Sequence, residues 1–208
     1  MGKIKKDINN LSKEAGSKTK ARRSAEKWFE DASKSIKDNS VATHSKPFKI
    51  GMIHVFRYEK PLNMKTLEWW DKNPVVLALE PHESGTDVGI NLNLLPVQFK
   101  EDLLDMIYER MAGQIKSKSG RSKENNALTQ GEITLIYKDI KKFLVQFGFD
   151  FAIRQYVPQL KKNQKVVSYE SWAKIALCDF QDLNGIGINE VKRAYRDHLQ
   201  TRSKRKDI

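Results

Sequence analysis

The sequence predicts an α+β protein in which a small antiparallel β-unit is followed by several helices. Three short apolar runs, at residues 49–59, 75–80 and 88–96, have the length and alternation of strands. The segment HESGTD joins the second run to the third and contains a glycine, which predicts a hairpin. Longer apolar patterns with helical spacing lie on either side of this unit. We therefore expect a hairpin-based sheet, either open or barrel-like, with helices around it.

The composition points to a basic protein with polyanionic partners. The 208 residues include 38 Lys and Arg against 26 Asp and Glu, a formal net charge of +12. Such a balance favours DNA, RNA or an anionic membrane surface. No apolar stretch approaches the length of a membrane span. The single cysteine, Cys178, cannot form an internal disulfide and lies in an apolar run, so we interpret it as a small buried hydrophobe in a reducing compartment.

Residues 1–38 are predicted to form a basic N-terminal helical arm. Its apolar residues recur at alternating spacings of three and four, with Lys18 and Arg22 in a charged gap and Gly16 beside it. A stripe this narrow has to dock on its own domain, on a sister subunit or on another protein; the alternative is a frayed basic tail. We expect the rest of the protein to fold without the arm. The candidate partner-contact residues of the arm are Ile4, Ile8, Leu11, Ala25, Phe29 and Ile36.

A linker at 39–47 leads into a predicted core domain at 48–180. Leu77 and Leu92 should face the interior, with Ile90, Leu92 and Leu94 on one face of the third strand. Helices are predicted at 97–111, 132–148 and 168–180, the last with Ser168 or Ser171 as its N-cap. A mobile basic loop is expected near 116–131 and a basic turn at 161–165. A C-terminal helix and basic tail are expected at 181–208.

The core also carries a recognisable pattern. It consists of Phe56, residues 58–61, the Trp69–Trp70 pair with Asp71 and Lys72, Pro74, residues 77–80 and 89–92, and Leu95–Pro96. Arg154, Tyr156 and the Tyr169, Trp172, Ala176, Leu177, Phe180 set extend it. Over residues 48–180 the chain resembles a family of DNA end protectors from T-even-type tailed phages and their cyanophage relatives. The resemblance implies a virion component at the DNA end or head-tail junction, and it carries no catalytic residue.

Two kinds of feature are candidates for DNA contact. Gly185 and Gly187 form a Leu-x-Gly-Ile-Gly turn that would bring backbone N–H groups to a phosphate, with Arg193 and Arg196 adding charge; the alternative is a simple helix cap and helix start. The second feature is a set of basic runs that would neutralise phosphates without reading bases, or would only be solvated surface. These runs are Lys18, Lys20, Arg22 and Arg23; Lys116, Lys118, Arg121 and Lys123; and Arg202, Lys204, Arg205 and Lys206.

The sequence gives little support for base stacking, metal binding or catalysis. Trp69 and Trp70 are adjacent and would be able to stack on unpaired bases. We favour the interpretation that they are core or partner-interface residues. The four histidines are far apart and lack the spacing of metal ligands, and the acidic residues are scattered. We expect no metal, no cofactor and no enzymatic activity.

Together these features predict a non-enzymatic tailed-phage virion protein at the head-tail junction or the packaged DNA end. It would assemble through its N-terminal arm and contact double-stranded DNA without sequence preference. Expected partners are portal, neck or tail components, with several copies in a symmetric assembly and no membrane contact. We expect it in the virion, and in the host cytoplasm during assembly. The alternatives are a purely structural portal, neck, tail or capsid protein without DNA contact, and a nucleic-acid-binding accessory protein of the infected cell.

Overall fold

The computed structural model describes most of the chain and confirms the α+β class. The described residues are 1–37, 48–59, 71–81, 85–117 and 130–179, together with Asn189 and Arg193. The helices are α1 (Lys3–Glu14), α2 (Lys18–Lys37), α3 (Val97–Ser117), α4 (Gln130–Gln146) and α5 (Trp172–Leu177). The strands are β1 (Ile53–Tyr58), β2 (Val75–Pro81), β3 (Asp87–Asn91), β4 (Ile153–Tyr156) and β5 (Lys161–Val167).

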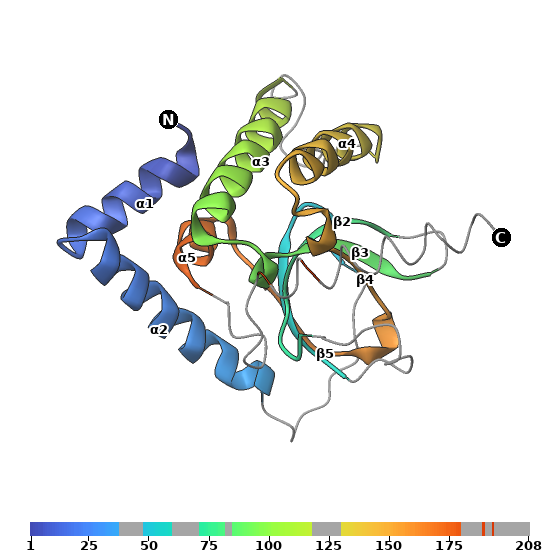
Figure 1. Cartoon of the computed structure of the whole chain (residues 1–208), viewed down its shortest axis with the longest axis horizontal. Helices are drawn as coiled ribbons and strands as arrows, with labels where there is room; N and C mark the ends of the chain where they lie inside the picture. Colours follow the sequence, from blue (N-terminus) through green and yellow to red (C-terminus); the bar gives the residue numbers. More distant parts are fainter. Residues whose placement is uncertain are drawn as a thin grey trace.

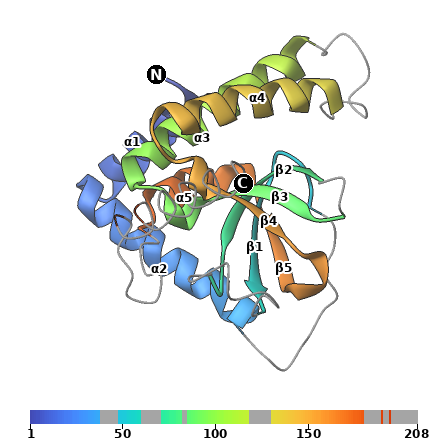
Figure 2. The ribbon, with the colours of Figure 1, turned by 45° about the vertical axis from the view of Figure 1, so that its right-hand side comes forward.

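The five strands form one antiparallel sheet in the order β4-β3-β2-β1-β5. The predicted hairpin is confirmed, because β2 pairs with β3 and places Leu77 opposite Ile90. The sheet is open: β4 and β5 are its two edges, so the barrel-like alternative does not hold. Figure 1 shows α1, α2, α3 and α5 gathered on one side of the sheet, and Figure 2 shows α4 running along the outer edge of the molecule beside α3.

Alternation along the strands separates two apolar clusters. Ile53, Leu77 and Ile90 face the helices and belong to the large core, in which Leu77 and Leu92 are buried as the sequence predicts. Phe56 and Tyr156 lie on the other face in a small aromatic cluster, where their ring centroids are 5.3 Å apart. Because successive side chains of a strand point to opposite faces, a short strand such as β1 serves both clusters.

The third strand ends earlier than the sequence suggests. We expected Ile90, Leu92 and Leu94 to share one strand face, but β3 stops at Asn91 and Leu92–Leu94 is a 3-10 turn. The Asn91 side chain accepts a hydrogen bond from the Asn93 amide at 3.0 Å, which holds the turn. All three apolar residues are buried in spite of the change in geometry. Burial was therefore predictable here, whereas the backbone conformation was not.

The two edge strands were missed. The segment predicted as a basic turn at 161–165 lies in β5, which pairs with β1. The lysine-rich sequence of β5 resembles an exposed turn rather than a strand. Lys161 nevertheless points inward and forms a buried ion pair with Asp87 of β3. The pairing register shifts between Val55 and Arg57, and Asn163 there has a φ of 53°. This irregularity is a β-bulge, and it interrupts the alternation that would have revealed the strand.

The N-terminal arm is two helices rather than one. The helix is interrupted at Gly16, whose φ of 80° is the left-handed conformation that glycine adopts without strain. The amides of Ile4 and Lys5 donate to the Asp105 carboxylate of α3, at 3.0 and 3.3 Å, and the Lys3 amide donates to Glu109 at 2.9 Å. Carboxylates of α3 therefore cap the positive N-terminus of α1.

This docking corrects the expected role of the arm residues. Ile4, Ile8, Ala25 and Ile36 are buried in the core of their own chain, so a protein partner cannot reach them while the helices are packed. Leu11 and Phe29 are partly buried against the same core. Docking on its own domain is thus the arrangement that the structure shows.

The remaining predicted helices are present with adjusted ends. The side chain of Ser171 makes no capping hydrogen bond at the start of α5, and Trp172 next to it is fully buried. Cys178 is buried, with 1% of its surface exposed, as the sequence predicts. Among the described residues no helix combines the length and the apolar character needed to cross a bilayer. The predicted linker, most of the basic loop near 116–131 and nearly all of 181–208 lie outside the described residues.

Candidate nucleic-acid interface

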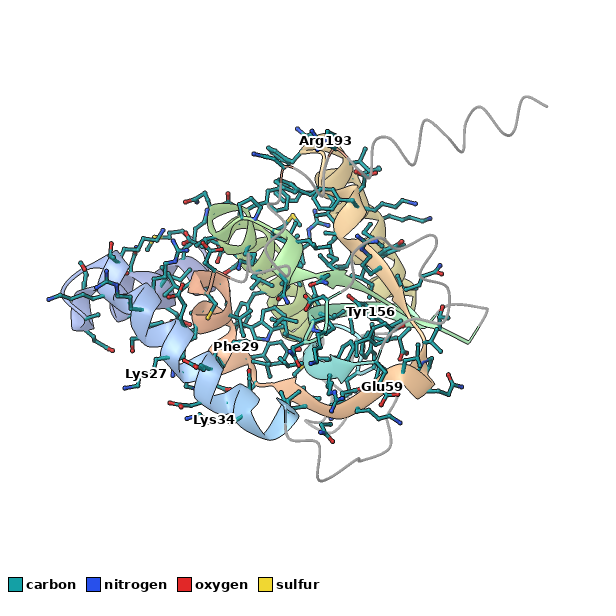
Figure 3. All side chains as sticks on the ribbon, turned by 60° about the horizontal axis from the view of Figure 1, so that its bottom comes forward. Lys27, Phe29, Lys34, Glu59, Tyr156 and Arg193 are labelled. Carbon is teal, nitrogen blue, oxygen red and sulfur yellow. The ribbon has the colours of Figure 1, made fainter. Side chains whose placement is uncertain are left out.

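The outward face of α2 carries a row of basic side chains. Lys20, Arg23, Lys27 and Lys34 are exposed, and at 3.6 residues per turn they fall within an arc of about 60° on the helix. The opposite side of α2 is buried, which fixes the direction of this row. Figure 3 shows Lys27 and Lys34 projecting from the outer side of α2, whereas Phe29 lies on the side that faces the core. We call these four residues the α2 basic face.

The α2 basic face is weakly neutralised. Lys34 pairs with Asp31 at 2.6 Å, one helical turn away. Lys20, Arg23 and Lys27 have no ion-pair partner in the part of the chain that the structure describes. From Lys20 to Lys34 the face extends about 21 Å along the helix axis. That length matches about six base-pair steps of a duplex, at 3.4 Å per phosphate along each strand.

The predicted basic run in this helix divides into two pairs with different surroundings. Lys20 and Arg23 belong to the α2 basic face. Lys18 and Arg22 point toward the core side: Lys18 pairs with Glu101 of α3 at 2.8 Å, and Arg22 pairs with Asp179 and with Glu26. We expected all four to be available to DNA, but Lys18 and Arg22 already hold α2 against its neighbours.

Arg22 belongs to a charged cluster at the C-terminal end of α5. The buried Lys100 amine of α3 donates to the Cys178 carbonyl oxygen, and the Asp179 amide lies 3.4 Å from the Glu26 carboxylate of α2. Burial lowers the pKa of Lys100 to about 8, against the opposing effect of nearby negative groups such as Asp179. The cluster therefore joins α2, α3 and the end of α5, and it fixes the orientation of the α2 basic face.

A second basic face lies on α4 and was not predicted. Lys138, Lys141 and Lys142 are exposed and share one side of the helix with Val145, because residues three, four and seven apart lie on one face. None of the three lysines has an ion-pair partner among the described residues. The spacing was visible in the sequence, as was the seven-residue repeat of Lys20, Lys27 and Lys34. We predicted basic surfaces from runs of neighbouring charges in the sequence. The basic faces of α2 and α4 are formed instead by basic residues at helical spacing.

Arg193 is the one C-terminal candidate that the structure describes. It is exposed, and Figure 3 places it on the other side of the molecule from Lys27 and Lys34. Lys116 lies in the last turn of α3, where side chains are not described. The candidates outside the described residues are Trp69, Trp70, Lys118, Arg121, Lys123, Gly185, Gly187, Arg196, Arg202, Lys204, Arg205 and Lys206.

Charged groups inside the sheet serve the fold. Asp87 accepts from the Lys161 amine in a buried pair, and that amine lies 4.0 Å from the centre of the Phe48 ring. Burial is the largest influence on Lys161 and lowers the pKa of its amine, while the hydrogen bond to Asp87 opposes the shift. Among the described residues no three His, Cys, Asp or Glu side chains are grouped as a metal site.

Comparison with known proteins identifies the family. A family model described as phage T4 terminal DNA protecting protein matches residues 1–191 of this chain. The chain belongs to this family. The match confirms the resemblance seen in the core and extends it over α1 and α2, which lay outside that resemblance. No curated protein and no solved structure matches the chain.

Proposed function

We propose that this protein is a non-enzymatic component of a tailed-phage virion that binds the ends of packaged duplex DNA. Membership of the terminal DNA protecting family carries the proposal. The net charge of +12 supports a polyanionic partner. Its place would be the packaged DNA end or the head-tail junction, beside portal, neck or tail components and in several copies. Assembly contacts would then involve outward surfaces, because the core-facing residues of the arm are already buried.

The α2 basic face is the surface we propose for phosphate contact. Its side chains are exposed, and one side of α2 is packed on the core, so the helix cannot enter a groove deeply. Long basic side chains on such a ridge reach phosphates rather than base edges, and phosphates carry no sequence information directly. Binding should therefore be similar on unrelated sequences and should weaken steeply with salt. The C-terminal run from Arg193 to Lys206 remains a further candidate for the same kind of contact.

A salt titration tests this proposal. We expect the variant in which Lys20, Arg23, Lys27 and Lys34 are all changed to Gln to bind duplex DNA more weakly. Its salt slope, log K against log salt, should be shallower by about 0.9 for each phosphate that the variant no longer neutralises. The measurement is binding of wild type and variant to two unrelated linear duplexes at several salt concentrations.

A matched control separates the effect of one surface from that of net charge. Lys6, Lys13, Lys49 and Lys72 are exposed and lie elsewhere, so their combined change to Gln removes the same charge. This control should retain most of the wild-type slope. An equal reduction of the slope in both variants would show that only net charge matters and would remove the α2 basic face from the proposal. No binding by the wild type at low salt would favour the structural alternative without DNA contact.

A further inference from the structure

Three lysines form a compact basic face on α4. Lys138, Lys141 and Lys142 are exposed, and they fall within an arc of about 100° on the helix. Ile136 and Ile140 are buried on the side of the helix opposite to this arc. The packing of α4 on α3 and β2 therefore turns the three lysines away from the core. We call Lys138, Lys141 and Lys142 the α4 basic face.

The charge of the α4 basic face is available to a partner. None of its lysines forms an ion pair within the part of the chain that the structure describes. Asp139, which follows Lys138 in the helix, is paired with Arg110 of α3. Lys141 and Lys142 lie near the C-terminal end of α4, where positive charge also stabilises the helix dipole. Lys138 lies in the middle of the helix and gains little from the dipole, so helix stability does not explain the whole face.

The composition of the α4 basic face suits phosphates better than a protein surface. Lysine is depleted in the centres of protein–protein interfaces, which are apolar and rich in aromatic residues. The exposed Val145 lies on the same side of α4, and a single valine supplies little of the roughly 800 Å² that each partner buries in a stable complex. Lys138 and Lys142 are about 6 Å apart along the axis, so their long side chains reach neighbouring phosphates of one strand.

The α4 basic face and the α2 basic face lie on separate parts of the molecule. The helix α2 packs on α1, α5 and β5, whereas α4 packs on α3 and β2. Figures 1 and 2 show α2 and α4 at opposite ends of the molecule, with α3 and α5 between them. A compact chain of 208 residues has a radius of gyration of roughly 17 Å, whereas duplex DNA stays straight over about 500 Å. A single duplex would therefore have to bend sharply around the protein to reach both faces.

From this arrangement we infer that the α4 basic face binds the phosphates of a second duplex, so that one molecule of this protein holds two stretches of DNA together. The inference rests on the proposed function and deepens it, because the α2 basic face is the first of the two contacts. Neither contact reads bases, since phosphates carry no sequence information directly. The protein would therefore join unrelated duplexes as readily as identical ones.

A capture experiment tests this inference. One linear duplex is fixed on beads, and the protein is bound to it at a low ratio of protein to duplex, so that bound copies are sparse. A labelled duplex of unrelated sequence is then added at low salt. We expect the wild type to retain the labelled duplex. Retention should weaken steeply with salt, because each phosphate contact releases counterions.

The decisive variant removes the α4 basic face. Changing Lys138, Lys141 and Lys142 together to Gln should abolish retention of the labelled duplex, while the protein stays on the fixed duplex through the α2 basic face. The three side chains are exposed, so the fold should be unaffected, and circular dichroism melting checks this. A matched control changes the exposed Lys6, Lys13 and Lys49 to Gln and removes the same charge. The control should retain the labelled duplex as the wild type does.

Stoichiometry in solution gives an independent readout. With duplex in excess at low salt, each wild-type molecule should bind two duplexes in sedimentation velocity, and each molecule of the α4 variant should bind one. The control variant should bind two. This measurement does not depend on the density of protein on a bead.

The possible failures are distinguishable. A wild type that does not bind the fixed duplex would overturn the proposed function and this inference with it. Normal binding to the fixed duplex without retention of the labelled one would overturn the second contact alone, and an acidic protein would then be the better partner for the α4 basic face. Retention that survives in the α4 variant would show that two copies of the protein, rather than two faces of one copy, join the duplexes, which also overturns the inference.

Discussion

Asn163 links an edge strand to a helix end through one side chain. It sits at the bulge of β5 with a φ of 53°, a left-handed conformation that Asn tolerates better than most residues. Its side-chain amide donates to the Ile36 carbonyl at 3.3 Å, near the C-terminus of α2. The last carbonyls of a helix lack partners within the helix, so this bond satisfies one of them. A single residue therefore satisfies a carbonyl group at the end of α2 and shapes β5.

Substitution of Asn163 should separate these two roles. Asn163→Gly keeps the left-handed backbone and removes the hydrogen bond, at a cost of about 0.5–1.5 kcal/mol. Asn163→Ala removes the bond and also strains the backbone, which adds about 1–2 kcal/mol. The measurement is the free energy of unfolding from urea denaturation of the three proteins. Equal stability of the Gly and Ala variants would show that the backbone at this position is not strained.

His54 is buried on the face of the sheet that carries the aromatic cluster. Its Nε2 atom lies 2.9 Å from the Lys49 amide, and its Nδ1 atom lies 3.0 Å from the side-chain amide of Gln164. Burial lowers the pKa of the imidazole to about 4, and the nearby positive charge of Lys161 acts in the same direction. A hydrogen bond from the ring to the Lys49 carbonyl oxygen, 3.1 Å from Nε2, and the charge of Asp87 oppose this lowering of the pKa. The folded protein therefore keeps His54 neutral.

This burial predicts a decrease of stability in mild acid. The unfolded chain binds a proton at an ordinary pKa of about 6.5, and the folded chain binds it near 4, so the unfolded state takes up more protons between these values. Stability should fall as the pH drops from about 6.5 to 4, by on the order of 3 kcal/mol from this group. His54→Gln should flatten the pH dependence of the urea midpoint over that window. An unchanged pH profile in the variant would assign the acid sensitivity to other groups.

Among the secondary-structure elements, α3 organises the N-terminal helices. Its acidic side chains face them: Glu101 pairs with Lys18, Asp102 pairs with Lys5, and Asp105 accepts from the first turn of α1. The arm thus matches α3 in charge as well as in apolar contact. The sequence predicted an apolar stripe on the arm but did not indicate that the arm packs on α3. The acidic residues of α3 lie about a hundred positions away along the chain.

Removal of residues 1–37 should therefore unfold the protein or greatly lower its Tm, in contrast to the expectation from sequence. Burial of Ile4, Ile8 and Ile36 alone contributes on the order of 5–9 kcal/mol, comparable to the stability of a whole domain. Circular dichroism melting of the truncated chain provides the measurement. Ile8→Ala offers a milder test, with an expected cost of about 2–5 kcal/mol, and the exposed Asn9→Ala is its control. Cooperative unfolding of the truncated chain at the wild-type Tm would contradict this prediction.

At the scale of the whole molecule, the two basic faces point in different directions. Figures 1 and 2 show α2 and α4 at opposite ends of the molecule with α3 and α5 between them, although both pack on the same large core. A duplex that binds along the α2 basic face would therefore leave Lys138, Lys141 and Lys142 of α4 free for another stretch of DNA.

The local sequence pattern was sufficient to predict part of this structure. The β2–β3 hairpin, the helical segments of α3 and α4 and the burial of Leu77, Leu92 and Cys178 were predictable, because alternation and helical spacing are properties of neighbouring residues. The family was recognisable from the motifs of the core for the same reason. Net charge alone indicated a polyanionic partner.

Other features depended on contacts between distant residues. Lys161 lies in a strand because Asp87, in another strand, compensates its burial. Lys18 and Arg22 are held in ion pairs with Glu101 and Asp179, whereas Lys20, Arg23 and Lys27 lie on the outward face of α2. Which lysine is structural and which is free to bind is decided by the position of the nearest carboxylate in space. Sequence determined that the protein is basic and helical at its N-terminus, and tertiary structure decided where its free charge lies.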